Sequence, residues 1–105
     1  MTALALTGFL GLSAALFGIG IFGILTRRNF ILLLISIEIA MNAAILNFVY
    51  FAAFPTGASG LSGQSIAVVL VGFAATEVAV GLAIVLALNR VKGTINVARA
   101  TELKQ

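Results

Sequence analysis

Hydrophobic residues fill three long stretches of this chain, and polar residues gather in the short segments between them. The stretches run from Thr2 to Leu25, from Phe30 to Phe54 and from Ser65 to Leu88. Each reaches or exceeds the ~20 residues that a helix needs to cross a ~30 Å hydrocarbon core. The pattern predicts an all-α membrane protein with three transmembrane helices.

We expect residues 1–105 to form a single membrane domain. Its helices are expected at about residues 2–26, 29–54 and 64–89, and a polar tail is expected at 90–105. The composition agrees, because 62% of the 105 residues are hydrophobic and only 9% are charged. A soluble domain of this size would expose large apolar patches. The first stretch is not a typical signal peptide, because it is too long and "MTALALTGFL" lacks a basic start.

The chain contains no cysteine and no histidine. Disulfides, thiolate metal sites and iron–sulfur clusters are thereby excluded, as are histidine proton relays and the common kinds of haem ligation. We expect no cofactor and no metal ion in this chain, and any electron chemistry in another polypeptide. The net charge of +3 does not indicate a nucleic-acid partner, because all six basic residues flank the hydrophobic stretches.

The positions of these basic residues predict the orientation in the membrane. Arg27 and Arg28 lie between the first two stretches, and the other four follow the third: Arg90, Lys92, Arg99 and Lys104. The positive-inside rule places the N-terminus outside, the "TRRN" turn inside, the loop "PTGASGLSGQ" outside and the C-terminus inside. We expect Pro55, Gly57, Gly60 and Gly63 to interrupt the helices and form that outer loop.

Two glutamates interrupt the apolar stretches. Glu38 lies ten residues past Arg28, about 15 Å along a helix, and Glu77 lies thirteen residues before Arg90, about 20 Å from the same surface. Both carboxyls are therefore expected near the middle of the membrane. An ionised acid there costs at least about 2.5–3.5 kcal/mol.

Interhelical hydrogen bonding alone is a poor explanation for these two acids. Asn, Ser or Thr would serve that purpose more cheaply, and such bonds average only about 0.6 kcal/mol in membranes. Burial disfavours the charged form of a carboxyl, so a buried glutamate can be neutral at pH 7 and ionise only when a cation or water approaches. That property suits the uptake and release of protons. We interpret Glu38 and Glu77 as candidate proton-translocating groups.

Small and polar residues mark more than one face of each stretch. Asn42 shares the face of Glu38, one turn further along, and is a supporting candidate. The other small or polar stripes are Ser36, Ala40, Ala43 and Asn47 in the second stretch, Gly72, Thr76, Ala79 and Ala83 in the third, and Gly11, Ala15 and Gly18 in the first. Helix packing is the usual role of such stripes. Three helices cannot cover all these faces, so we expect a larger membrane assembly.

Two other classes of membrane protein share some of these features. A rotor-ring subunit of a rotary ATPase is a Gly-rich hairpin with a mid-membrane Glu, but it has a GxGxGxG run and a loop proline. This chain lacks both and has a third helix with its own Glu. A small cation exporter would favour aromatic residues around its site, whereas Trp is absent and Tyr50 is the one tyrosine.

The segments "GILTRRNFILLLISIEIAMNAAILNFV", "GQ" and "AATEVAVGLAIVLALNR" resemble the K subunit (4L in mitochondria) of respiratory complex I, the NADH:quinone oxidoreductase family. The most specific elements are the "RRN" hairpin, the "SIE…NA" helix and the "E-x-A-x-GLA" helix. The likeness runs from Leu10 to the "TELK" ending. Thr76 departs from the family, where Ala is more usual, and the outer loop is somewhat long.

The resemblance implies specific roles for these residues. Glu38 and Glu77 match the family's glutamates of the second and third helices, which belong to a chain of buried ionisable residues used in proton translocation. Arg27 and Arg28 match a basic inner turn that the family needs for full activity. Gly81 matches a small residue one turn after the third-helix glutamate.

The resemblance also implies the function of the whole chain. It would be a non-redox membrane-arm subunit of a proton-pumping NADH:quinone oxidoreductase, with the quinone and the redox centres in partner subunits. The expected partners are antiporter-like and small hydrophobic membrane subunits, together with lipid. The alternatives are a related cation/proton antiporter or membrane-bound hydrogenase complex, or a rotor-ring subunit. The bacterial plasma membrane is the expected location, with a thylakoid or organelle inner membrane as alternatives.

Overall fold

The computed structural model describes residues 3–53, 60–93 and 95–98, and it gives the backbone alone for residues 60–62. Three helices make up the fold: α1 (Ala3–Thr26), α2 (Phe30–Ala53) and α3 (Gly60–Lys92). Each is long and apolar enough to cross a membrane. The prediction of an all-α chain with three such helices is confirmed.

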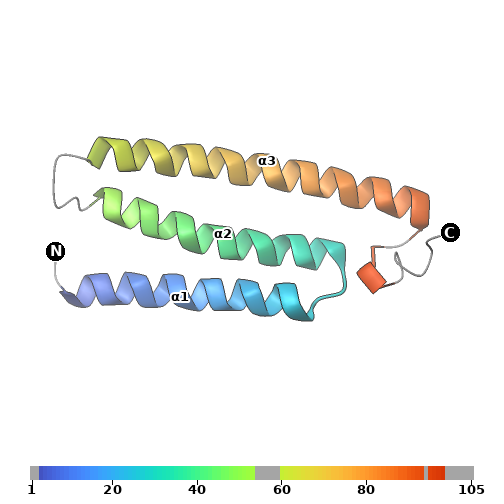
Figure 1. Cartoon of the computed structure of the whole chain (residues 1–105), viewed down its shortest axis with the longest axis horizontal. Coiled ribbons are helices and arrows are strands. Elements are labelled where there is room, and N and C mark those ends of the chain that lie inside the picture. Colours follow the sequence, from blue (N-terminus) through green and yellow to red (C-terminus); the bar gives the residue numbers. More distant parts are fainter. Residues whose placement is uncertain (1–2, 54–59, 94, 99–105) are drawn as a thin grey trace.

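The three helices lie side by side in one flat layer, with α2 between α1 and α3 (Figure 1). The fold measures 57 × 24 × 14 Å along its principal axes. Its thinnest dimension is close to the ~10–12 Å diameter of one helix with its side chains. A layer one helix thick has no enclosed core, so large apolar side chains such as Phe17, Phe22 and Phe73 lie exposed on its surface.

Small residues let α1 and α2 approach closely. A β-carbon at Gly20 would lie 2.7 Å from both the Cβ and the backbone nitrogen of Ala40. A β-carbon at Gly23 would lie 2.7 Å from Ser36 Cβ. These distances are well below the ~3.5–4.0 Å of an ordinary contact between carbon atoms. The spacing of the two helices therefore depends on glycine at both positions.

A buried hydrogen bond crosses the same contact. Ser13 donates its hydroxyl to the carbonyl oxygen of Ala43 at 2.9 Å, and Phe9 stacks on the buried ring of Tyr50 with their centroids 4.2 Å apart. Interhelical bonds and close packing of small residues are the main forces between helices in lipid. The α1–α2 pair uses both.

Of the small-residue stripes predicted from the sequence, the one on α2 is packed against a neighbouring helix and those on α1 and α3 are open. In α2, the residues Ser36, Ala40 and Ala43 are buried against α1, and Asn47 is half-buried. In α1 the expected stripe does not face α2, because a β-carbon at Gly11 or Gly18 would meet nothing within 4 Å. The α3 stripe is likewise open: Gly72 has free space, and Thr76, Ala79 and Ala83 are exposed.

The contact between α2 and α3 also uses glycine. A β-carbon at Gly63 would lie 2.9 Å from Ala52 Cβ, and one at Gly81 would lie 2.7 Å from Leu34 Cδ1. The expectation that Gly60 and Gly63 belong to the outer loop is wrong, because α3 begins at Gly60 and continues through Gly63. Glycine is well tolerated in membrane helices, and here it permits the approach of Ala52. The other two expected breakers, Pro55 and Gly57, lie outside the described residues.

Backbone and cap interactions define the ends of the helices beside the basic turn. Asn29 is the N-cap of α2, since its Oδ1 accepts hydrogen bonds from the amides of Ile31 at 2.9 Å and Leu32 at 3.3 Å. At the end of α3, Gly93 has a φ of 68° and donates its amide to Asn89 O. This left-handed conformation suits glycine and turns the chain back toward α2.

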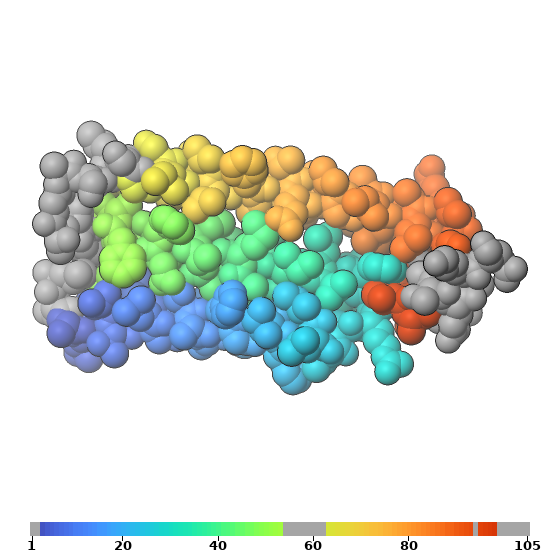
Figure 2. Space-filling view, viewed as in Figure 1, coloured from blue at the N-terminus to red at the C-terminus, as the bar shows by residue number. Residues whose placement is uncertain are grey.

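The first part of the tail docks on the turn between α1 and α2. Phe30 donates its amide to Ile95 O at 2.8 Å, and Val97 donates its amide to Arg28 O at 2.6 Å. Figure 2 shows this segment in red against the cyan start of α2. The tail thus joins the end of α3 to the basic turn, and the remaining tail residues 99–105 lie outside the described part of the chain.

Candidate functional site

Glu38 lies in the first half of α2 and is half-buried. Its Oε2 atom is buried and has no hydrogen-bond partner among the residues that the structure describes. The side chain lines an apolar groove of about 260 Å³, together with residues that include Ile35, Val78 and Leu82. A buried acceptor without a partner costs about 1–3 kcal/mol. Glu38 is therefore positioned to bind a water molecule or a donor from a neighbouring chain.

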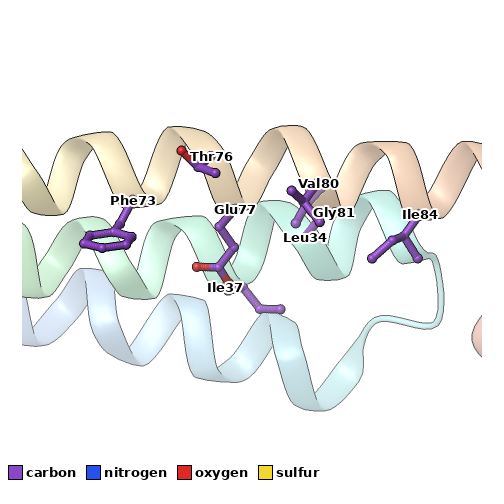
Figure 3. A pocket seen from close by; sticks show the side chains of 8 residues that line it. All are labelled: Leu34, Ile37, Phe73, Thr76, Glu77, Val80, Gly81 and Ile84. Carbon is purple, nitrogen blue, oxygen red and sulfur yellow. The ribbon is translucent and has the colours of Figure 1, made fainter.

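Glu77 lies in α3 and lines a second groove, of about 520 Å³. In Figure 3 its side chain points from α3 toward α2, between Phe73 and Val80. In the single chain Glu77 is exposed. An ionised carboxyl facing lipid at this depth would cost about 2.5–3.5 kcal/mol or more. The position therefore calls for a polar neighbour from outside this chain, or for a neutral carboxyl.

The two carboxyls lie at the same level of the α2–α3 pair. Leu34 contacts Gly81, and these residues lie four positions before Glu38 and four positions after Glu77. Because the helices are antiparallel, this register places Glu38 opposite Glu77. The contact of Ala52 with Gly63 gives the same register, since each lies fourteen positions from its glutamate.

The two glutamates nevertheless line different grooves. The groove of Glu38 contains Val78 and Leu82 from α3, whereas the groove of Glu77 contains Val80 and Ile84. Successive helix positions are about 100° apart, so these pairs belong to opposite sides of the face that α3 turns to α2. The two acids thus flank the α2–α3 contact, one on each side of the layer. Joining them requires a connection across the contact between the helices.

The supporting residues lie apart from the carboxyls. Asn42 is exposed on α2, one turn beyond Glu38. Arg27 and Arg28 are exposed in the turn that follows α1, at the far end of the layer from the α2–α3 connection. In the docking of the described part of the tail, the backbone carbonyl of Arg28 accepts the amide of Val97.

Two further residues belong to this site. Leu34 lines both grooves, and Gly81 contacts it. The sequence marked Gly81 as a small residue one turn after Glu77, but Leu34 resembles every other leucine in an apolar stretch. Its role follows from the register of the two helices. Among the described residues, no cluster of three or more His, Cys, Asp or Glu side chains could hold a metal ion.

Comparison with known families gives the relationship of the chain. A family model described as NADH-ubiquinone/plastoquinone oxidoreductase chain 4L matches residues 8–105. The chain belongs to the chain 4L family. This is the family that the "RRN", "SIE…NA" and "E-x-A-x-GLA" elements resemble, and the chain 4L match extends almost to the end of the sequence.

Individual relatives support the same assignment and carry the name NADH-quinone oxidoreductase subunit K. One from Anaeromyxobacter sp. (strain K) is 47% identical over 89 residues, covering 85% of this chain and 87% of the relative. A subunit K 1 from Syntrophobacter fumaroxidans is 46% identical over 99 residues, covering 94% and 96%. One from Bacillus anthracis is 42% identical, covering 99% of both chains. As a chain 4L protein, this chain is a subunit of the NADH-quinone oxidoreductase complex, whose other subunits are its partners.

Proposed function

We propose that this chain is a membrane-arm subunit of a proton-pumping NADH:quinone oxidoreductase, in which Glu38 and Glu77 take up and release protons. The observation that carries the proposal is the position of the two acids, which lie opposite each other at one level of the α2–α3 pair. Glu38 also has a buried oxygen without a partner in the described residues. Hydrogen-bonding glue would leave neither an orphaned acceptor nor an exposed acid.

The chain contributes protonatable groups and not electron carriers. It has no cysteine or histidine, so quinone reduction and the redox centres belong to partner subunits. Rearrangement near the quinone site would change the hydration and charge around Glu38 and Glu77, and so their proton affinities. Because the two carboxyls lie opposite each other, they would exchange protons as a coupled pair.

Open faces of the layer support contacts with several membrane subunits. The small-residue stripes of α1 and α3 have free space at Gly11, Gly18 and Gly72, and Glu77 lies exposed beside the α3 stripe. Antiporter-like and small hydrophobic subunits of the membrane arm are the proposed neighbours on these faces. Small residues are where membrane helices meet most closely.

The proposed orientation follows from the basic residues. The turn that contains Arg27 and Arg28 and the docked tail lie at the same end of the layer. The positive-inside rule assigns that end to the cytoplasm and the N-terminus to the outside. The relatives come from bacteria, so the proposed location is a bacterial plasma membrane.

Conservative substitutions separate proton transfer from packing. Glu38→Gln keeps the size and hydrogen bonding of the side chain but cannot ionise, whereas Glu38→Asp keeps the acid on a shorter stem. If Glu38 carries protons, the Asp variant retains part of the quinone-linked turnover and pumping, and the Gln variant loses most of both. If Glu38 only packs, the Gln variant is the milder change, because an amide is cheaper to bury than a charge. The same comparison applies to Glu77.

The measurement uses the intact complex in membrane vesicles, with NADH-driven quinone reduction and proton uptake recorded together. Blue-native gels establish that each variant is assembled. Thr7→Val is the matched control, because Thr7 lies on α1, lines neither groove, and has its hydroxyl bonded to Ala3 O at 2.9 Å. Wild-type pumping by both assembled Gln variants would overturn the proposed function.

A further inference from the structure

The contact between α2 and α3 separates the two carboxylate grooves, and Leu34 is the residue that they share. It lines the 260 Å³ groove of Glu38 and the 520 Å³ groove of Glu77. The two acids lie on opposite sides of this contact, and Leu34 is the side chain that borders both grooves. An isobutyl side chain offers no hydrogen bond to water. Leu34 therefore forms an apolar wall between two acid-lined spaces.

Gly81 lets Leu34 occupy this place. A β-carbon at position 81 would lie 2.7 Å from Leu34 Cδ1 and 3.3 Å from Cδ2. The methyl groups of Leu34 thus fill the space that any other residue would use for its own side chain. The neighbouring position on α3 toward the basic turn, Val85, is buried and continues the packing. Between the glutamates and the basic turn, the described α2–α3 contact is lined by apolar residues that include Phe30, Leu33 and Val85.

We propose that Leu34, seated on Gly81, is a hydrophobic gate that controls the passage of water and protons between the Glu77 groove and the Glu38 groove. The gate rests on the proposed function of the two glutamates. Apolar constrictions in membrane proteins gate by excluding water, and they open when a small displacement lets water enter. Leu34 is a positioning residue in this scheme, because it binds no proton itself.

The transfer that the gate controls conserves charge. A neutral Glu77 releases the proton of its O–H bond to a hydrogen-bonded water, which passes a proton to the Glu38 carboxylate. A new O–H bond forms at Glu38, Glu77 becomes ionised, and the pair keeps one proton and one negative charge. With Leu34 on Gly81 the water bridge is broken and each acid exchanges protons only on its own side of the layer. Movement of Leu34 completes the bridge.

Truncation of Leu34 tests the gate in the assembled complex. Leu34→Ala joins the two grooves, so NADH-driven quinone reduction continues while the number of protons pumped per electron falls. Leu34→Met keeps the apolar bulk, so it should keep the wild-type number of protons pumped per electron. Leu33→Ala is the matched control, because Leu33 is half-buried on the same helix but lines neither of the two grooves. A structural role alone would make the two alanine variants alike.

Membrane vesicles supply both readouts, and the Glu38→Gln complex serves as a reference. The gate is supported if Leu34→Ala lowers the number of protons pumped per electron while Leu34→Met and Leu33→Ala keep the wild-type number. If Leu34→Ala does not assemble, Leu34→Val removes less bulk and gives a smaller loss of the same ratio. A wild-type ratio in the assembled Ala or Val variant overturns the gate. Normal pumping by both the Glu38→Gln and the Glu77→Gln complexes instead overturns the proposed function on which the gate rests.

Discussion

The close approach of α1 to α2 predicts that one overpacked variant can be rescued and that another cannot. A β-carbon at Gly23 would overlap only the side chain of Ser36, at 2.7 Å from its Cβ, and would lie 3.8 Å from its Cα. A β-carbon at Gly20 would instead lie 2.7 Å from the backbone nitrogen of Ala40 and 2.9 Å from its Cα. Removal of the opposing side chain makes room in the first case alone.

The magnitudes follow from these distances. Forcing one extra methyl group into a packed contact costs about 1–3 kcal/mol, and replacing a helical glycine by alanine returns up to about 1 kcal/mol. Gly23→Ala should therefore destabilise the helix pair by about 1–2 kcal/mol, a factor of about 5–30 in its equilibrium. Adding Ser36→Gly should recover most of this loss, with a coupling energy of about 1–2 kcal/mol. Gly20→Ala should cost at least as much, and Ala40→Gly should not restore it.

The assay is the thermal inactivation midpoint of the assembled complex, together with the assembled fraction on blue-native gels. Four single variants and the two pairs complete both double-mutant cycles. Ser36→Gly by itself loses the bond from Ser36 Oγ to Leu32 O, at 2.8 Å, and this loss is taken into account by the cycle. Equal rescue of both pairs, or no rescue of the Gly23 pair, would refute the geometry of the α1–α2 contact.

Two further predictions concern the basic end of the layer. In oriented vesicles, a cysteine introduced by Ser59→Cys should react with an impermeant thiol reagent from outside and one introduced by Ala98→Cys only from inside; the reverse labelling would invert the proposed orientation. Replacing Arg27 and Arg28 together by Ala should lower pumping or assembly while leaving soluble NADH oxidation intact, and replacement by Lys should not, since Lys keeps the positive charge. Unchanged quinone-linked activity in the assembled Ala variant would limit these arginines to setting topology.

The sequence was sufficient for the three helices, because apolar length is enough to predict a membrane span. It also identified Ser36, Ala40 and Ala43 as one stripe of small residues suited to helix packing, and the structure shows that this stripe packs on α1. It did not identify the matching face of α1. That helix is apolar all round and carries glycine on several sides, so no polar face distinguishes the packed side from the open one.

The candidate site could be predicted only in part for a similar reason. Residue counting from the basic turns placed Glu38 and Glu77 at similar depth, and the register of α2 and α3 puts them at one level. Which groove each glutamate lines depends on which face of each helix is packed. The sequence does not show that face, because apolar residues lie on all sides of both helices. Gly63 was wrongly predicted to lie in the outer loop, because glycine often forms turns. In the structure it permits the close approach of Ala52 instead.

Glu38 and Glu77 are proposed to change protonation during turnover, and infrared difference spectroscopy of the intact complex can detect this change. Spectra recorded between the resting and NADH-reduced states report protonated carboxyl groups through their C=O stretching band, which shifts in heavy water. We expect a turnover-dependent carboxyl band that is lost or reduced in assembled Glu38→Gln and Glu77→Gln complexes and is retained in Thr7→Val. Identical carboxyl bands in the wild type and in both Gln variants would contradict it.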